Sequence, residues 1–89
     1  MRFSVPHSHP ALQGHFPDHP IVPAVLILEA VLMAAGQQRP DQITRVAQAK
    51  FTSILLPDQT CLITLTPSAK GLRFTCKADS RTVATGLLW

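Results

Sequence analysis

The chain has 89 residues, of which 46% are hydrophobic and 15% charged, and its formal net charge is +3. This length and composition predict one globular domain over residues 1–89, with a core so small that pairing with a second chain is a natural way to stabilise it. The basic residues are scattered from Arg2 to Arg81 without interleaved aromatics, which is not the pattern of a nucleic-acid-binding surface. The first residues contain no apolar run, so we expect no secretory signal and a cytoplasmic protein.

The first half of the chain predicts a short strand, a loop and one helix. Residues 2–6 can form the strand, and the many prolines that follow, up to Pro20, exclude regular structure there. The segment Ile21 to Gly36 is apolar almost throughout, with Pro23 placed for the first helical turn and Gly36 for the C-terminal cap. Such a helix is expected to be buried on all sides. It is shorter than the roughly 20 residues that a bilayer requires, and Glu29 lies near its middle, so a membrane span is rejected.

The second half predicts a sheet. Four runs rich in Val, Ile, Thr and Leu, at 43–55, 60–66, 71–79 and 82–88, are separated by turn residues, which favours an antiparallel meander. In the third run apolar and polar residues alternate, so one face of the sheet is apolar and needs a cover. The helix is the only candidate for that cover, and we predict an α+β fold in which a curved antiparallel sheet wraps around one long helix.

Cysteines and histidines leave alternatives open. Cys61 and Cys76 lack the spacing of a zinc or redox motif and favour free thiols in a reducing compartment, with a disulfide across a hairpin as the lesser alternative. The prolines of the loop disfavour convergence of its histidines on a metal, and no carboxylate or thiolate pattern assists them. These histidines are His7, His9, His15 and His19.

Two ionisable residues stand out as candidates for proton transfer. Glu29 has almost no polar neighbours in the predicted helix. Burial in such surroundings would raise its pKa, and a protonated carboxyl can serve as a general acid. The alternative is that Glu29 faces a solvent gap or pairs with an arginine across a subunit contact. His15, between Gly14 and Phe16 in the loop, has an unperturbed pKa suited to a general base, although a loop histidine is commonly bonded to backbone.

Removal of a proton beside a thioester carbonyl, with protonation of a leaving hydroxyl, needs one base and one acid, and His15 and Glu29 are side chains of these two kinds. His15 would remove the α proton, and Glu29 would protonate the departing hydroxyl. The helix N-terminus, with the N–H groups of Ala24 and Val25, would hold the developing enolate oxygen. These steps require no metal or redox cofactor.

A longer motif supports this chemistry through a family resemblance. The stretch Gly14-His-Phe-Pro-Asp-His-Pro-Ile-Val-Pro-Ala-Val-Leu-Ile-Leu-Glu-Ala30 closely resembles the G-H-F-P-x-x-P-x-x-P-G-V-L-x-x-E/D-A signature of bacterial 3-hydroxyacyl-acyl-carrier-protein dehydratases. The histidine and the acid keep their separation of fourteen positions, as His15 and Glu29. Weaker similarity continues through Ala49-Lys50-Phe51 and Leu56-Pro57-Asp58-Gln59. The short form of the chain is most similar to the dehydratase-like proteins of aryl-polyene pigment pathways.

The resemblance implies a hot-dog fold and a dimer in which His15 of one subunit faces Glu29 of the other. It also implies a substrate held by phosphopantetheine on an acidic acyl-carrier protein, which suits the mildly basic surface. The sequence leaves open whether the partner is a second copy or a related chain. Candidate walls of the acyl tunnel, which are more commonly plain core, are Leu26, Leu28, Met33, Phe16 and Phe51.

The chain departs from the family pattern at two positions, where Ala24 replaces a glycine and Met33 replaces a glutamine. The usual N-terminal extension of the family is also missing from this sequence. Two other functions stay open: a hot-dog thioesterase that uses the helix carboxylate and not His15, and a non-catalytic subunit that binds acyl-carrier protein or a homologous dehydratase.

Overall fold

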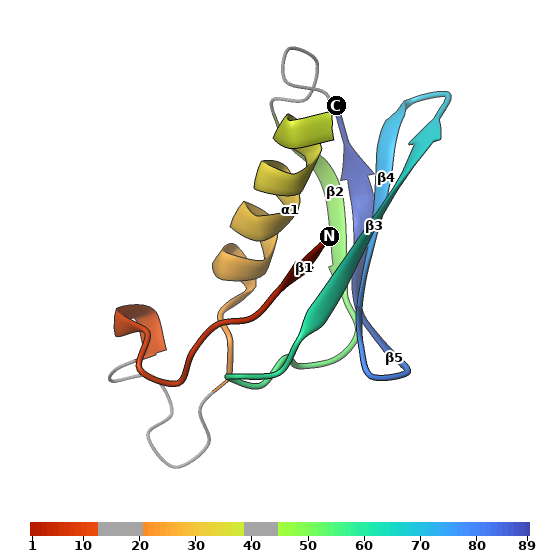
Figure 1. The fold of residues 1–89 in the computed structure, drawn as a ribbon. Helices are drawn as coiled ribbons and strands as arrows, with labels where there is room; N and C mark the ends of the chain where they lie inside the picture. The colour runs from red at the N-terminus through yellow and green to blue at the C-terminus, as the bar shows by residue number, and fades with distance from the viewer. Residues whose placement is uncertain (13–20, 39–44) are drawn as a thin grey trace.

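The computed structural model describes residues 1–12, 21–38 and 45–89 of the chain. One long helix, α1, lies along one face of a strongly twisted sheet (Figure 1). A short 3-10 helix, Pro10–Leu12, follows the first strand. The main elements are β1 (Arg2–Phe3), α1 (Ala24–Gln38), β2 (Val46–Phe51), β3 (Cys61–Ser68), β4 (Gly71–Ala78) and β5 (Arg81–Leu88).

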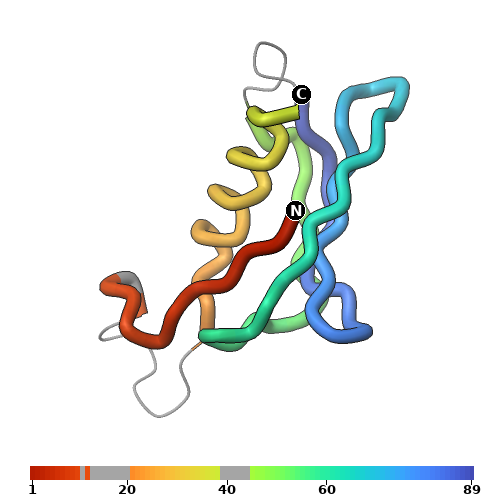
Figure 2. The backbone as a smooth tube through the Cα atoms, in the orientation of Figure 1, coloured from red at the N-terminus to blue at the C-terminus, as the bar shows by residue number. Residues whose placement is uncertain are grey.

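Within the described residues the strands form one five-stranded antiparallel sheet in the order β1-β3-β4-β5-β2. The predicted hairpins β3–β4 and β4–β5 are confirmed, but the prediction of a meander throughout is wrong at the first step. β2 pairs with β5 at the far edge of the sheet and not with β3, its neighbour in sequence. Residues 52–60 therefore cross from one edge of the sheet to the other, and they are called the crossover segment below (Figure 2).

The predicted helix is present with shifted ends. It begins at Ala24, directly after Pro23, and it continues through Gly36 to Gln38. Gly36 therefore lies in the last turn and does not form the C-terminal cap, and it is not among the residues with positive φ. The expectation of burial on all sides is wrong for the chain by itself, because only the side of the helix that faces the sheet is covered. The buried helix residues are Ile27, Val31, Ala34 and Ala35.

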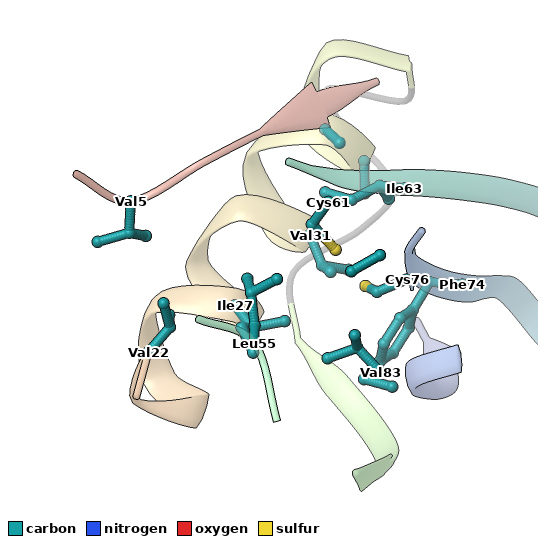
Figure 3. Packing of buried hydrophobic residues seen from close by; sticks show 14 of the residues in the cluster. Val5, Val22, Ile27, Val31, Leu55, Cys61, Ile63, Phe74, Cys76 and Val83 are labelled. Carbon is teal, nitrogen blue, oxygen red and sulfur yellow. The ribbon is translucent and has the colours of Figure 1, made fainter. Parts of the chain in front are cut away.

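The core lies between α1 and the inner face of the sheet. The predicted alternation in β4 is confirmed, since Phe74 is fully buried and its neighbour Arg73 is exposed. Figure 3 shows Val31 of the helix among the side chains of the sheet, with Leu55 of the crossover segment beside Ile27. Leu55 is 0% exposed, so the crossover segment contributes to the core although it contains no helix or strand. The inward residues of β4 are Leu72, Phe74, Cys76 and Ala78.

Gly86 is a position where the fold demands a glycine. A Cβ atom added there would clash with the backbone oxygen of Gln48 and with the ring of Phe74. We expect Gly86→Ala to lower the free energy of unfolding by about 2 kcal/mol or more, because strands β2 and β5 would have to separate. Urea denaturation measures the change. Gly36→Ala is the matched control, since nothing lies within 4 Å of its added Cβ, and it should leave stability unchanged or raise it by about 0.5–1 kcal/mol. Equal midpoints for Gly86→Ala and the wild type would contradict this account.

Helix α1 has 15 residues. No helix within the described part of the chain combines the length and the apolar character that a membrane crossing requires.

Candidate active site at the N-terminal half of helix α1

The first turn of α1 begins with two exposed residues whose N–H groups have no acceptor within the helix. The N–H groups of Ala24 and Val25 stand at the start of the helix, where the helix itself offers them no acceptor. Both side chains are exposed, Val25 by 59%. The next donor, Leu26 N–H, is used within the turn and bonds to the carbonyl of Pro23 at 3.1 Å. The sequence prediction of an anion-attracting helix terminus at Ala24 and Val25 thus falls on an accessible surface.

Glu29 lies one turn further along the same side of the helix. It is the only charged residue of α1, and it is exposed, so of the two alternatives left open by the sequence, burial or a solvent-facing side chain, the single chain shows the second. The reason is geometric, because Glu29 is four residues from Val25 and from Met33 and shares their outward side. Among the described residues Glu29 has no ion-pair partner. The exposed stripe of α1 consists of Val25, Glu29, Met33 and Gln37.

Four of the predicted tunnel residues lie within the described part of the chain, and two of them are exposed. Met33 is 67% exposed and Phe51 40% exposed, whereas Leu26 and Leu28 are half-buried. A role for Met33 and Phe51 as tunnel walls therefore remains a prediction about an assembled protein.

The remaining sequence candidates include residues that the structure does not describe. His15, Phe16 and His19 lie outside the described residues. His7 is described, and its Nδ1 lies 2.9 Å from Oδ2 of Asp58. No group of three or more His, Cys, Asp or Glu side chains able to hold a metal ion occurs in the described ranges.

The crossover segment fixes the start of the helix, a feature that the sequence did not reveal. Val22 N–H donates to the carbonyl of Leu55 at 2.8 Å. The side chain of Arg81, at the start of β5, donates to Ser53 Oγ and, at 2.9 Å, to the carbonyl of Ile54. These contacts join residues more than twenty positions apart, so no local pattern could have indicated them.

The two cysteines form a separate, buried pair beneath α1. Cys61 and Cys76 are free thiols on β3 and β4, and their sulfur atoms lie close together in Figure 3. The hydrogen bond with Cys61, together with burial, raises the pKa of the Cys76 thiol, and the same bond lowers the pKa of Cys61. Both side chains are 0% exposed, so they belong to the core and not to the candidate site.

A cavity of about 300 Å³ lies at the other end of α1. It is bounded by helix and sheet residues and by the first residue of the chain, and none of the described residues that line it has an ionisable side chain. Its lining residues are Met1, Ala34, Gln37, Gln38, Ile63 and Leu65. Because Ala24 and Val25 begin the helix, this cavity is distinct from the candidate site.

Comparison with known proteins gives consistent matches. The family model described as ApeI-like, ApeI dehydratase, matches residues 1–87. The chain is 38% identical over 74 residues to 3-hydroxyacyl-[acyl-carrier-protein] dehydratase FabZ of Magnetococcus marinus, covering 71% of this chain and 48% of that protein. It is 35% identical over 77 residues to the FabZ of a Thermoanaerobacter species, covering 75% and 54%. The chain thus spans about half the length of these curated relatives.

A solved structure shares the fold. A chain of the dehydratase heterocomplex ApeI:P from Xenorhabdus doucetiae superposes with a TM-score of 0.80 at 23% identity, over 98% of this chain and 80% of that one. This similarity confirms the predicted hot-dog fold.

Proposed function

The chain belongs to the ApeI-like dehydratase family, and from this premise we propose that it removes water from a (3R)-hydroxyacyl thioester on acyl-carrier protein to give the trans-2-enoyl thioester. The observation that carries the proposal is the arrangement of α1, in which the two first-turn residues Ala24 and Val25 and, one turn further, the only carboxylate of the helix are all exposed. The curated relatives, which are named 3-hydroxyacyl-[acyl-carrier-protein] dehydratases, support this class of reaction.

In the proposed mechanism each step is a proton transfer or a hydrogen bond. His15 takes the α proton of the substrate, and the N–H groups of Ala24 and Val25 stabilise the negative charge that develops on the thioester oxygen. Glu29 donates a proton to the 3-hydroxyl, which leaves as water. The base and the acid together complete the proton balance, so the mechanism requires no metal or redox cofactor.

The proposed site is completed by a second subunit. In one chain Glu29 is surrounded by exposed apolar side chains, Val25 at 59% and Met33 at 67%, and such a stripe suits a protein contact. A partner over this stripe would bury Glu29, close a tunnel beside Met33 and bring its own His15 to Glu29. The partner is a second copy or a related hot-dog chain. The similar structure from Xenorhabdus doucetiae is a dehydratase heterocomplex, which supports the second choice.

The substrate would arrive by phosphopantetheine on an acidic acyl-carrier protein, in fatty-acid-like or aryl-polyene biosynthesis, and we place the reaction in the cytoplasm. The formal charge of +3 supports an acidic partner. Ala24 keeps the backbone donor that the proposal needs and adds one methyl group beside it.

Incubation with 3-hydroxyacyl-carrier protein, followed by mass spectrometry of the intact carrier, tests the proposal. We expect loss of water from the acyl group, either with this protein alone or after it has been mixed with a related hot-dog chain that assembles with it. Release of free acid that does not require His15 would instead identify a thioesterase. Binding of the carrier without either product, at every chain length, would identify a non-catalytic subunit.

A further inference from the structure

The crossover segment, residues 52–60, forms backbone hydrogen bonds with several parts of the chain that lie far apart in the sequence. At its start, Thr52 N–H donates to the carbonyl of Val83 at 2.9 Å. In its middle, the Leu55 carbonyl accepts the N–H of Val22 at 2.8 Å, two residues before α1 begins. Near its end, Asp58 N–H donates to the carbonyl of Val5 at 2.7 Å. A displacement of this segment would therefore move the start of the helix.

Arg81 is a side chain of the sheet that binds three acceptors in the crossover segment. It is the first residue of β5 and is partly buried. One guanidinium nitrogen donates to Ser53 Oγ and to the Ile54 carbonyl, and the other donates to Gln59 Oε1 at 3.2 Å. A planar guanidinium with several fixed donors can bind three acceptors at once, which a lysine ammonium cannot do in the same geometry.

Gln59 extends this network to the β4–β5 turn. Its Oε1 accepts the N–H of Leu56 at 3.1 Å, and its Nε2 donates to Asp79 Oδ2 at 2.9 Å. Arg81 and Asp79 belong to the same hairpin, so both ends of the network are anchored in the central sheet. Side chains of the β4–β5 hairpin therefore bind the crossover segment both before and after Leu55.

Leu55 transmits this restraint to the helix. It directly follows Ile54, whose carbonyl Arg81 binds, and its own side chain is fully buried. Figure 3 shows the Leu55 side chain beside Val22 and Ile27, at the first turns of α1. Side-chain packing and the Val22 hydrogen bond therefore act at the same place, the start of the helix.

We propose that Arg81 is a positioning residue for the dehydration, because it fixes the Leu55 carbonyl and so the direction of the Ala24 and Val25 N–H groups. This inference rests on the proposed function. A donor directed at a developing oxyanion is effective only in correct geometry, and small displacements lower the rate of the chemical step. Arg81 itself does not touch the substrate in this scheme.

The positioning role is tested by measuring kcat and KM of three variants, which are Arg81→Gln, Arg81→Lys and Arg73→Gln. We expect Arg81→Gln to lower kcat about tenfold while KM stays within about twofold, since the donors remain but are misdirected. Arg81→Lys should recover part of the loss, because an ammonium replaces some of the bonds. Arg73→Gln removes an exposed arginine from the neighbouring strand and should behave as the wild type. An unchanged kcat in a folded Arg81→Gln protein would overturn the positioning role.

Amide hydrogen exchange tests the restraint without using activity. In Arg81→Gln the N–H of Val22 should exchange at least about tenfold faster, whereas that of Thr75 in the central strand β4 should be unchanged. Equal exchange at Val22 in variant and wild type would overturn the proposal. Absence of dehydration in the wild type, with and without its related partner, would overturn the proposed function and the catalytic part of this inference. The exchange result would then still decide whether Arg81 holds the start of α1.

Discussion

Replacement of Glu29 by Gln is expected to lower the rate of dehydration by about 10³-fold, because an amide cannot deliver the proton that the departing hydroxyl needs. The fold should be unaffected, since Glu29 is exposed and has no ion-pair partner among the described residues. Single-turnover dehydration of a 3-hydroxyacyl-carrier protein measures the rate, and circular dichroism verifies the fold.

Lys70→Gln is the control for the loss of one exposed charge, because Lys70 lies in the turn between β3 and β4. It should keep the wild-type rate. The companion variant His15→Ala should lose activity as Glu29→Gln does. A Glu29→Gln protein that retains more than a tenth of the wild-type rate would remove Glu29 from the role of acid.

The helix illustrates how far the sequence determines the fold and where it fails. The apolar segment, Pro23 and the alternating strands were sufficient to predict a helix packed on a curved sheet. The same apolar residues on every side of α1 led to the expectation of a helix buried on all sides, which is wrong for one chain, and they left open whether Glu29 is buried or faces solvent. A sequence records that a surface is apolar, but it does not record whether the covering surface belongs to the same chain or to another.

Strand order and the crossover segment show a second limit. The turns at 69–70 and 79–80 join strands that pair with each other, as local turn residues indicate. Leu56-Pro57-Asp58 has the same local character, yet it lies in a segment that spans the sheet from β2 to β3. Likewise the bonds from Arg81 to Ser53 and Ile54 depend on this non-local path. Such contacts follow from the assembled sheet and leave no spacing signal in the chain.

Met33→Glu is expected to abolish assembly and dehydration together while leaving each chain folded. Met33 is 67% exposed and lies one turn after Glu29 on the stripe that we propose as the subunit contact. An added carboxylate there would be desolvated beside Glu29, and its repulsion would oppose association. Light scattering measures the mass of the particle, and the carrier assay measures activity.

Leu62→Glu is the matched control for Met33→Glu, because it places the same charge at a residue that is 43% exposed on β3, opposite Lys77 and away from α1. It should leave both assembly and activity intact.

For the homodimer, co-expression of the His15→Ala and Glu29→Gln chains tests the shared site itself. Random pairing leaves about one quarter of the sites with both groups, so about a quarter of the wild-type activity should return. A Met33→Glu monomer with full activity would show that one chain suffices, and the shared site between subunits would have to be abandoned.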